Sequence, residues 1–224
     1  CFKIEAQTEK YVGVSGGGAM MLTLYGCPKT RSDRALWALE EKGVPYHVEW
    51  VNLSRGEGRT PAFLALNPAG KVPLLKDGDV ILTESLAICS YIADRCPGTT
   101  LAPVFGSDDR ARYEQWCSFA ISELEQPLWT ISKHKFALPA EWRVPAVIDT
   151  ARWEFAKAAQ LLAQGLGQHE FIVGDSFSVA DILIGHTLAW ARAFGVPTAQ
   201  PVVEAYADRL FARPAFMALP DAIG

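Results

Sequence analysis

The sequence lacks the features of several large classes of protein. It has no uninterrupted apolar run long enough to span a bilayer, and a formal net charge of −4 gives no reason to bind nucleic acid or an anionic membrane surface. Its five cysteines have neither paired nor zinc-type spacing, and its four histidines have no metal-binding spacing. We therefore predict a cytoplasmic protein with free thiols, no metal site, and neither nucleic acid nor membrane as partner.

The composition itself is that of an ordinary globular protein. Of the 224 residues, 50% are hydrophobic and 21% are charged, and the chain is long enough for a sizeable core in one or two domains. Residues 1–20 fit poorly with the rest. They have no basic flank followed by an apolar core and are therefore not a secretory signal, and the glycine run after Ser15 is typical of a flexible connector. We interpret residues 1–20 as an N-terminal extension, either natural or artificial, and expect the fold to begin near Met21.

The first half alternates strand and helix signals. Alternating or apolar runs predict strands, and apolar residues at helical spacing with Gly43 and Pro45 as stop signals predict helices. The expected elements are a strand at 21–25, a helix at 32–42, a strand at 46–50, a helix at 60–66, a hairpin at 73–82 and a helix from 85 onward. The order β-α-β-α-β-β-α, with the first two strands parallel, predicts a thioredoxin-like α/β domain over residues 21–96.

The second half has a different composition. Residues 97–106 are rich in proline, glycine and threonine and are expected to be a linker. Strand signals then vanish, and apolar residues recur at helical spacing over 108–133, 142–166, 178–194 and 202–212. The third helix opens on a capping box formed by Ser178 and Asp181. We predict an all-α helical bundle domain over residues 107–224.

One stretch of the first half carries the signs of a binding site. Proline cannot donate to a sheet ladder, so Pro73 must begin a strand or lie at its edge. Asp77-Gly78 is typical of a hairpin turn. Glu84 and Ser85 precede an apolar periodic run, as at a helix start, where free N–H groups attract a carboxylate or phosphate. The stretch predicts a small anionic, peptide-like ligand held by main chain on one side and by a helix N-terminus on the other.

Four motifs resemble the soluble bacterial members of the glutathione S-transferase family. They are residues 24–32 (LYGCPKTRS), 67–73 (NPAGKVP), 84–88 (ESLAI) and 177–182 (FSVADI), and the resemblance runs from about Met21 to the C-terminus. It implies a thioredoxin-like domain that binds glutathione as cosubstrate, a helical domain that completes the site for a small hydrophobic electrophile, a role in detoxification and a homodimer.

The same resemblance assigns the glutathione-binding residues. The bond before Pro73 is expected to be cis, with the Val72 backbone pairing with the cysteinyl part of glutathione. Glu84 is expected to meet the γ-glutamyl amine, and Ser85 the α-carboxylate. Lys71 is placed to reach a glutathione carboxylate or simply to face solvent. A rigid turn at Pro73 and a plain helix cap at Ser85 are the alternatives.

The activating hydroxyl is less well defined. An unperturbed thiol has a pKa of about 8.5, so a hydroxyl beside a helix N-terminus would stabilise the glutathione thiolate. Counting back from Arg34, Thr30 stands where serine-using classes of the family place this hydroxyl, and Ser32 is a second candidate. Thr30 and Asp33 also fit a capping-box variant, a purely structural alternative.

Cys27 offers a different chemistry. Cys27-Pro28-Lys29-Thr30 resembles the Cys-Pro-x-Ser/Thr motif of single-thiol glutaredoxins, and a thiol near a helix N-terminus is expected to have a lowered pKa. Such a cysteine would form a mixed disulfide with glutathione. Tyr25, the hydroxyl of the tyrosine-using classes, does not match their spacing and is expected to pack.

Aromatic residues of the helix at 108–133 are candidates for the electrophile pocket or for the core. We expect Trp116 to be core and Tyr113 or Phe119 to reach the cleft, with Trp129 a further candidate. Three functions stay open: a glutathione transferase, a glutathione-dependent thiol-disulfide oxidoreductase using Cys27, and a non-catalytic glutathione-binding or protein-interaction module.

Overall fold

The structure, a computed structural model, describes residues 22–220. The predicted extension at residues 1–20 lies outside this range. Among the described residues, one compact unit runs up to Thr99 and a second begins at Thr100. Within the described range, no helix is both long and apolar enough to cross a membrane.

The first unit is built on a four-stranded mixed sheet. Its strands are β1 (Leu22–Gly26), β2 (Tyr46–Trp50), β3 (Leu74–Asp77) and β4 (Val80–Thr83), in the order β2-β1-β3-β4. β1 and β2 are parallel, as predicted, and the other pairs are antiparallel. Asp77 pairs with Val80, so the hairpin turn is Gly78-Asp79, with Gly78 left-handed at φ 58°. The turn is therefore one residue later than predicted.

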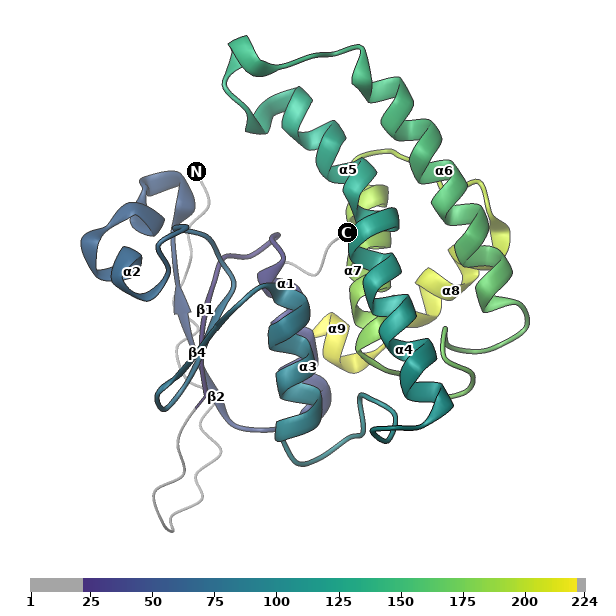
Figure 1. Ribbon diagram of the computed structural model, residues 1–224, viewed down its shortest axis with the longest axis horizontal. Helices are drawn as coiled ribbons and strands as arrows, with labels where there is room; N and C mark the ends of the chain where they lie inside the picture. The colour runs from purple at the N-terminus through teal and green to yellow at the C-terminus, as the bar shows by residue number, and fades with distance from the viewer. Residues whose placement is uncertain (1–21, 221–224) are drawn as a thin grey trace. The chain divides into compact units, whose positions relative to one another are not determined.

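Helices cover both faces of this sheet. The helices α1 (Ser32–Lys42) and α3 (Ser85–Arg95) lie on one side, and the short α2 (Pro61–Leu66) lies on the other (Figure 1). Two 3₁₀ turns, Leu53–Arg55 and Glu57–Arg59, lead into α2. The core between the sheet and the α1–α3 pair is apolar and almost fully buried, and includes Leu24, Leu36, Leu39, Leu75, Ile88 and Ile92. This packing fixes the N-termini of α1 and α3 relative to β1 and β3.

Two glycines bring the 3₁₀ turns against the loop before β3. A Cβ on Gly58 would lie 2.7 Å from the carbonyl oxygen of Gly70, and a Cβ on Gly70 would lie 2.6 Å from that of Gly58. Gly70 is also left-handed, with φ 65°. Side chains at either position would push the two backbones apart, so this contact sets the path of the chain into Val72.

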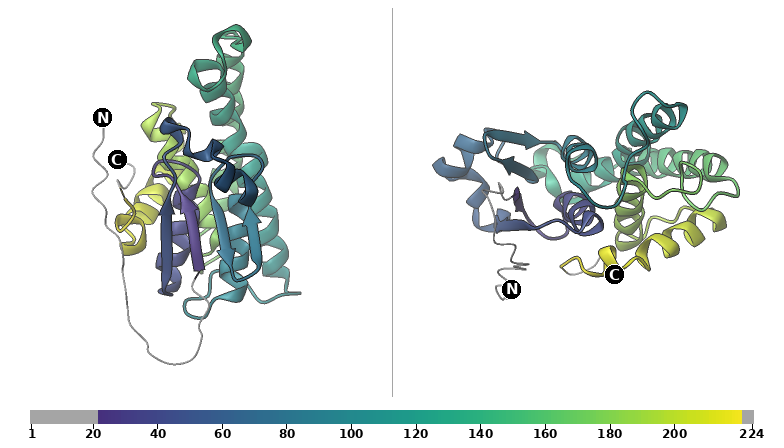
Figure 2. Two further views of the ribbon diagram at one scale, coloured as in Figure 1. Left: turned by 90° about the vertical axis from the view of Figure 1, so that its left-hand side faces the viewer. Right: turned by 90° about the horizontal axis from the view of Figure 1, so that it is seen from below.

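The second unit is entirely helical. Its helices are α4 (Asp108–Phe119), α5 (Glu125–Ser132), α6 (Val147–Leu166), α7 (Val179–Ala193), α8 (Pro201–Phe211) and α9 (Pro214–Met217). Stretches of π-helix at Ala120–Leu124 and Lys133–Ala137 extend α4 and α5 into one rod, and a 3₁₀ turn at Ala140–Trp142 precedes α6. α5 and α6 run side by side (Figures 1 and 2).

The centre of the helical unit is α7, most of whose residues are buried. The predicted capping box is present, and Asp181 Oδ2 accepts from the backbone N–H of Ser178 at 2.8 Å. The other carboxylate oxygen accepts from the Tyr206 hydroxyl at 2.6 Å and from the Ile172 N–H at 3.0 Å. Asp181 therefore ties α7 to α8 and to the preceding loop.

Candidate active site

The N-terminus of α3 forms one side of the candidate site. Glu84 is the N-cap residue and has left-handed φ 66°, an unusual value for a non-glycine residue. Its side chain is exposed, whereas Ser85 in the first helical position is only 6% exposed. The first-turn N–H groups of α3 have no partner within the helix, so this end can receive an anionic group beside an exposed carboxylate.

The loop before β3 provides a backbone edge. The Val72–Pro73 peptide bond is cis, as the resemblance implies. Val72 precedes the ladder that begins at Leu74, and within the described part of the chain its backbone makes no hydrogen bond. An unpaired N–H and C=O at a strand start can pair with an extended peptide.

An asparagine closes this loop. Asn67 is 5% exposed, and its Nδ2 donates to the carbonyl of Lys71 at 2.7 Å while its Oδ1 accepts from the N–H of Ala69 at 3.1 Å. The Lys71 side chain is exposed. The loop is therefore held at the residue that precedes Val72.

Arg34 meets the N-terminus of α3, a contact that was not predicted from the sequence. It is fully buried in α1, and its Nη1 donates to Ser85 Oγ at 3.2 Å. The bond leaves the Ser85 proton available to a ligand carboxylate, and the buried cation is electrostatically suited to such an anion. The sequence did carry one signal for this contact, namely that Arg34 stands among the apolar residues of α1. A buried charge needs a specific partner, so an arginine at such a position indicates a buried polar contact.

The loop between β1 and α1 holds the predicted chemistry-bearing residues. Cys27, Thr30 and Ser32 form a closed set of hydrogen bonds. Thr30 Oγ1 lies 2.6 Å from the Cys27 carbonyl oxygen and 2.9 Å from Ser32 Oγ, and the Cys27 N–H donates to Ser32 Oγ at 3.2 Å. The Thr30 hydroxyl is within donating distance of two acceptors, of which the Cys27 carbonyl is the nearer. A ligand thiolate would have to turn the hydroxyl proton toward itself.

Burial separates the two hydroxyl candidates. Ser32 is fully buried and supports the loop from inside, whereas Thr30 is only partly buried. Ser32 is therefore not exposed to a ligand. The alternative capping box does not form, because α1 has Arg31 as N-cap with no side-chain cap and Asp33 Oδ2 accepts instead from the N–H of Lys29 at 3.0 Å.

The expected lowering of the Cys27 pKa is wrong. Burial raises the pKa of the Cys27 thiol, and the carboxylates of Asp33 and Glu57 raise it further, while a hydrogen bond from the Leu53 backbone acts in the opposite direction. Cys27 directly follows β1 and lies outside the first turn of α1. Desolvation and the nearby carboxylates therefore outweigh the hydrogen bond from the Leu53 backbone.

The remaining cysteines that the structure describes have no role in this site. Cys89 and Cys117 are buried, and Cys96 is half-buried. Burial raises the pKa of Cys89 to about 12, so it stays a neutral thiol, as expected for a small apolar residue. Within residues 22–220, no cluster of three or more histidine, cysteine or acidic side chains could hold a metal ion.

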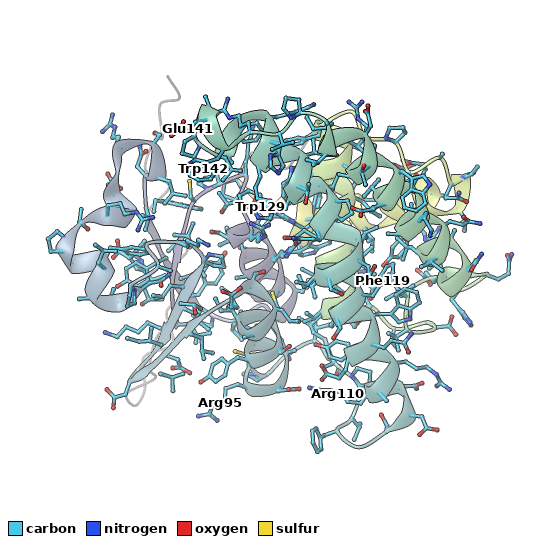
Figure 3. The ribbon with its side chains drawn as sticks, turned by 45° about the horizontal axis from the view of Figure 1, so that its top comes forward. Arg95, Arg110, Phe119, Trp129, Glu141 and Trp142 are labelled. Atoms are coloured by element: carbon cyan, nitrogen blue, oxygen red, sulfur yellow. The ribbon has the colours of Figure 1, made fainter. Side chains whose placement is uncertain are left out.

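The aromatic candidates of the helical unit fall into different environments. Tyr113 is fully buried, so of the two residues expected as alternatives for the cleft, Tyr113 or Phe119, only Phe119 has an accessible side chain. Trp116 and Phe119 are half-buried, and their rings pack edge-on with 5.1 Å between the ring centroids. Figure 3 shows Phe119 and Trp129 at different heights along the rod of α4 and α5. In the first unit, the ring of Tyr25 packs against that of Phe63 in α2, with 6.1 Å between the ring centroids, and Tyr25 was expected to pack.

The structure is that of a thioredoxin-like unit, which has a backbone edge at Val72 and two helix N-termini, followed by a helical unit. Comparison with known families agrees with this class. Residues 27–95 match the model of the glutathione S-transferase N-terminal domain, and residues 128–214 match that of the C-terminal domain.

Individual relatives agree with the family models. Glutathione S-transferase 3 of Zea mays is 33% identical over 87% of this chain and 91% of its own. The structure of glutathione transferase F7 from Populus trichocarpa matches with a TM-score of 0.80 and 27% identity, over 91% of this chain and all of that one. The structure of the transferase URE2P6 from Phanerochaete chrysosporium, solved in complex with oxidized glutathione, matches with a TM-score of 0.76 and 26% identity. The match covers 88% of this chain and 93% of that one. The chain belongs to the glutathione S-transferase family and is a glutathione transferase.

Proposed function

We propose that the protein conjugates the thiolate of glutathione to a small hydrophobic electrophile. One observation carries this proposal: the unpaired backbone of Val72 lies in the same unit as the α3 N-terminus, where Ser85 is oriented by Arg34. Glutathione has a peptide backbone in its middle and a zwitterionic γ-glutamyl end. The Val72 backbone would hold the first, and Glu84 and Ser85 would hold the second.

The proposed binding mode uses ordinary chemistry at each contact. The Val72 N–H and C=O exchange hydrogen bonds with the cysteinyl residue, as in strand addition. The exposed Glu84 carboxylate pairs with the γ-glutamyl ammonium. The Ser85 hydroxyl and the N–H groups of the first turn of α3 donate to the α-carboxylate. Lys71 is exposed and reaches a glutathione carboxylate as a flexible contact.

The proposed activating group is Thr30. Its hydroxyl leaves the Cys27 carbonyl and donates to the glutathione sulfur, which stabilises the thiolate together with the N-terminus of α1. The thiol proton passes to solvent, and the thiolate sulfur forms a C–S bond to the electrophilic carbon while a leaving group, such as the halide of an aryl halide, departs with the electron pair of its bond. The choice of Thr30 over Ser32 rests on burial, because only Thr30 has an accessible side chain.

The second candidate function is thiol-disulfide exchange through Cys27. Its support is the partial exposure of the thiol in the same loop as Thr30. Its raised pKa opposes this function, because the thiolate is the attacking species. A non-catalytic glutathione-binding or interaction module is the third candidate.

Three variants separate these functions. Thr30→Val removes the hydroxyl with little change of shape, Thr30→Ser restores it, and Cys27→Ser removes the thiol. We expect Thr30→Val to lower kcat for an aryl halide by about 10²-fold, the usual loss for one transition-state donor, and we expect Cys27→Ser to keep it. Loss of activity only in Cys27→Ser, with a mixed disulfide as substrate, would favour the oxidoreductase. If the protein is retained on immobilised glutathione but turns over no substrate, the non-catalytic binding or interaction module is favoured.

The oligomeric state, the cellular location, the domain boundaries and the branch of the family belong to the same proposal. We expect a homodimer, to be measured by light scattering, and a reducing, cytoplasmic location, supported by the four free cysteines of the described residues. We also expect domains at 21–96 and 107–224 with a linker at 97–106, which limited proteolysis would test. Membership of the soluble bacterial branch of the family stays a prediction.

A further inference from the structure

The loop that carries Thr30 contains a strained backbone. Lys29 has φ 59°, in the left-handed region that non-glycine residues other than asparagine and aspartate rarely adopt. It stands between Cys27 and Thr30, and its side chain is exposed. The backbone angles of Lys29 therefore decide where the Thr30 hydroxyl points, and some other group must hold them.

Asp33 makes contacts that can hold this conformation. It is 2% exposed, and its Oδ2 accepts from the N–H of Lys29 at 3.0 Å. Its own backbone N–H donates to the carbonyl of Thr30 at 3.1 Å. One residue thus binds the N–H that precedes the strained angles and the carbonyl that follows the hydroxyl-bearing residue. A hydrogen bond to a carboxylate is stronger than one between neutral groups.

This arrangement differs from an ordinary acidic residue in a first helical turn. Such residues normally interact with N–H groups of their own helix or with its dipole. The N-cap of α1 is Arg31, which has no side-chain cap, and Lys29 lies two residues before it. The Asp33 carboxylate therefore reaches out of the helix to the loop.

We propose that Asp33 is a positioning residue for catalysis, which holds Lys29 in its left-handed conformation and thereby places the Thr30 hydroxyl against the glutathione sulfur. The inference rests on the proposed function of Thr30. Loss of Asp33 should act on turnover more than on glutathione binding, because the binding groups Val72 and Ser85 come from other segments.

The test compares three changes. In Asp33→Ala the acceptor is lost, and we expect kcat to fall about tenfold or more, since small misplacements of reacting groups have effects of this size. The KM for glutathione should change less than about twofold. Asp33→Asn keeps an acceptor and should retain most of kcat. Adding Lys29→Gly to Asp33→Ala should restore part of kcat, because glycine adopts positive φ without strain. Asp109→Ala, which removes an exposed first-turn carboxylate from α4, is the control and should leave kcat unchanged.

Distinct results would overturn the inference. A folded Asp33→Ala protein with unchanged kcat would do so, as would equal losses in Asp33→Asn and Asp33→Ala, or a double variant without recovery. If Asp33→Ala does not fold, the Asp33→Asn protein and the double variant decide the question. Failure of the proposed function looks different: the unmodified protein would not turn over any electrophile, or Thr30→Val would be fully active.

Discussion

The bond between Arg34 and Ser85 leads to a prediction on both binding and stability. Ser85→Ala removes an oxygen that is 6% exposed and 3.2 Å from a fully buried guanidinium. It also removes the hydroxyl proposed to donate to the α-carboxylate of glutathione. A single substitution should therefore weaken the folded protein and its complex at once.

The size of each effect follows from the type of bond. Hydrogen bonds that involve a charged group contribute about 1.5–3 kcal/mol. For glutathione this corresponds to a Kd raised about 10- to 100-fold, because about 1.4 kcal/mol is tenfold. For the protein alone, the lost acceptor of Arg34 should lower Tm by about 3–12 °C, at about 2–4 °C per kcal/mol for a chain of this size.

Calorimetric titration with glutathione and thermal unfolding of Ser85→Ala measure the two effects separately. Ser85→Thr keeps the hydroxyl and should recover most of both. Ser90→Ala removes a serine from the middle of α3 and is the matched control, with little change in either quantity. A Ser85→Ala protein of lowered Tm but unchanged Kd would show that Ser85 serves only Arg34 and the helix, which would refute the proposed contact with glutathione.

Three further predictions concern packing and reactivity. Gly165→Ala should lower the free energy of unfolding by about 1–3 kcal/mol in urea titration, because its Cβ would lie 2.0 Å from Trp116 Cζ2; Gln164→Ala, on the exposed side of the same helix, should not, and equal effects would contradict the clash. Gly70→Ala should raise the KM for glutathione by about tenfold or more, because the left-handed backbone and a Cβ 2.6 Å from a neighbouring carbonyl oxygen displace the loop before Val72; an unchanged KM would argue against this loop as the binding edge. Alkylation of Cys27 in the folded protein should keep accelerating above pH 9, because its pKa is raised, whereas the unfolded chain should level off near the ordinary thiol pKa of about 8.5; a plateau below pH 8 in peptide mapping would contradict the raised pKa.

The sign of the Cys27 shift also sets a pH dependence of stability. A thiol whose pKa is higher in the folded state than in the unfolded state favours folding below the unfolded pKa. This contribution is lost as the pH rises through the folded pKa. Cys27→Ser should therefore flatten the fall of stability at alkaline pH.

The elements of the first unit could be predicted because their signals are local. The predicted helix at 32–42 coincides with α1, whose end is marked by Gly43, left-handed at φ 65°, and by Pro45 just beyond it. The hairpin turn was misplaced by one residue because the register of β3 on β4 depends on pairing between strands. Turn chemistry alone does not determine that pairing.

In the helical unit, the predicted start of α6 lies five residues too early. The helix expected from Trp142 begins at Val147, after a 3₁₀ turn. Pro145 explains the difference, because a proline disfavours helical conformation in the residue before it and is tolerated in a first turn. The short helix α9 gave no periodic signal, since it spans a single turn.

Some site residues could be predicted from local sequence signals, and others could not. The motif that contains Val72 and Ser85 combines local signals, and the structure places these residues at a strand start and a helix start. The sequence could not rank Thr30 above Ser32, because the two hydroxyls differ in burial and not in local pattern. Arg34 was missed for a related reason: its partner is 51 residues away along the chain.

The most direct test of the account is the pKa of the glutathione thiol in the complex. Ultraviolet difference absorbance of the thiolate, recorded against pH, measures this value. In the unmodified protein and in Cys27→Ser, we predict a pKa of the glutathione thiol clearly below the ordinary value of about 8.5. In Thr30→Val it should return toward that value. A low pKa that persists in Thr30→Val would contradict the assignment of Thr30 as the group that activates glutathione.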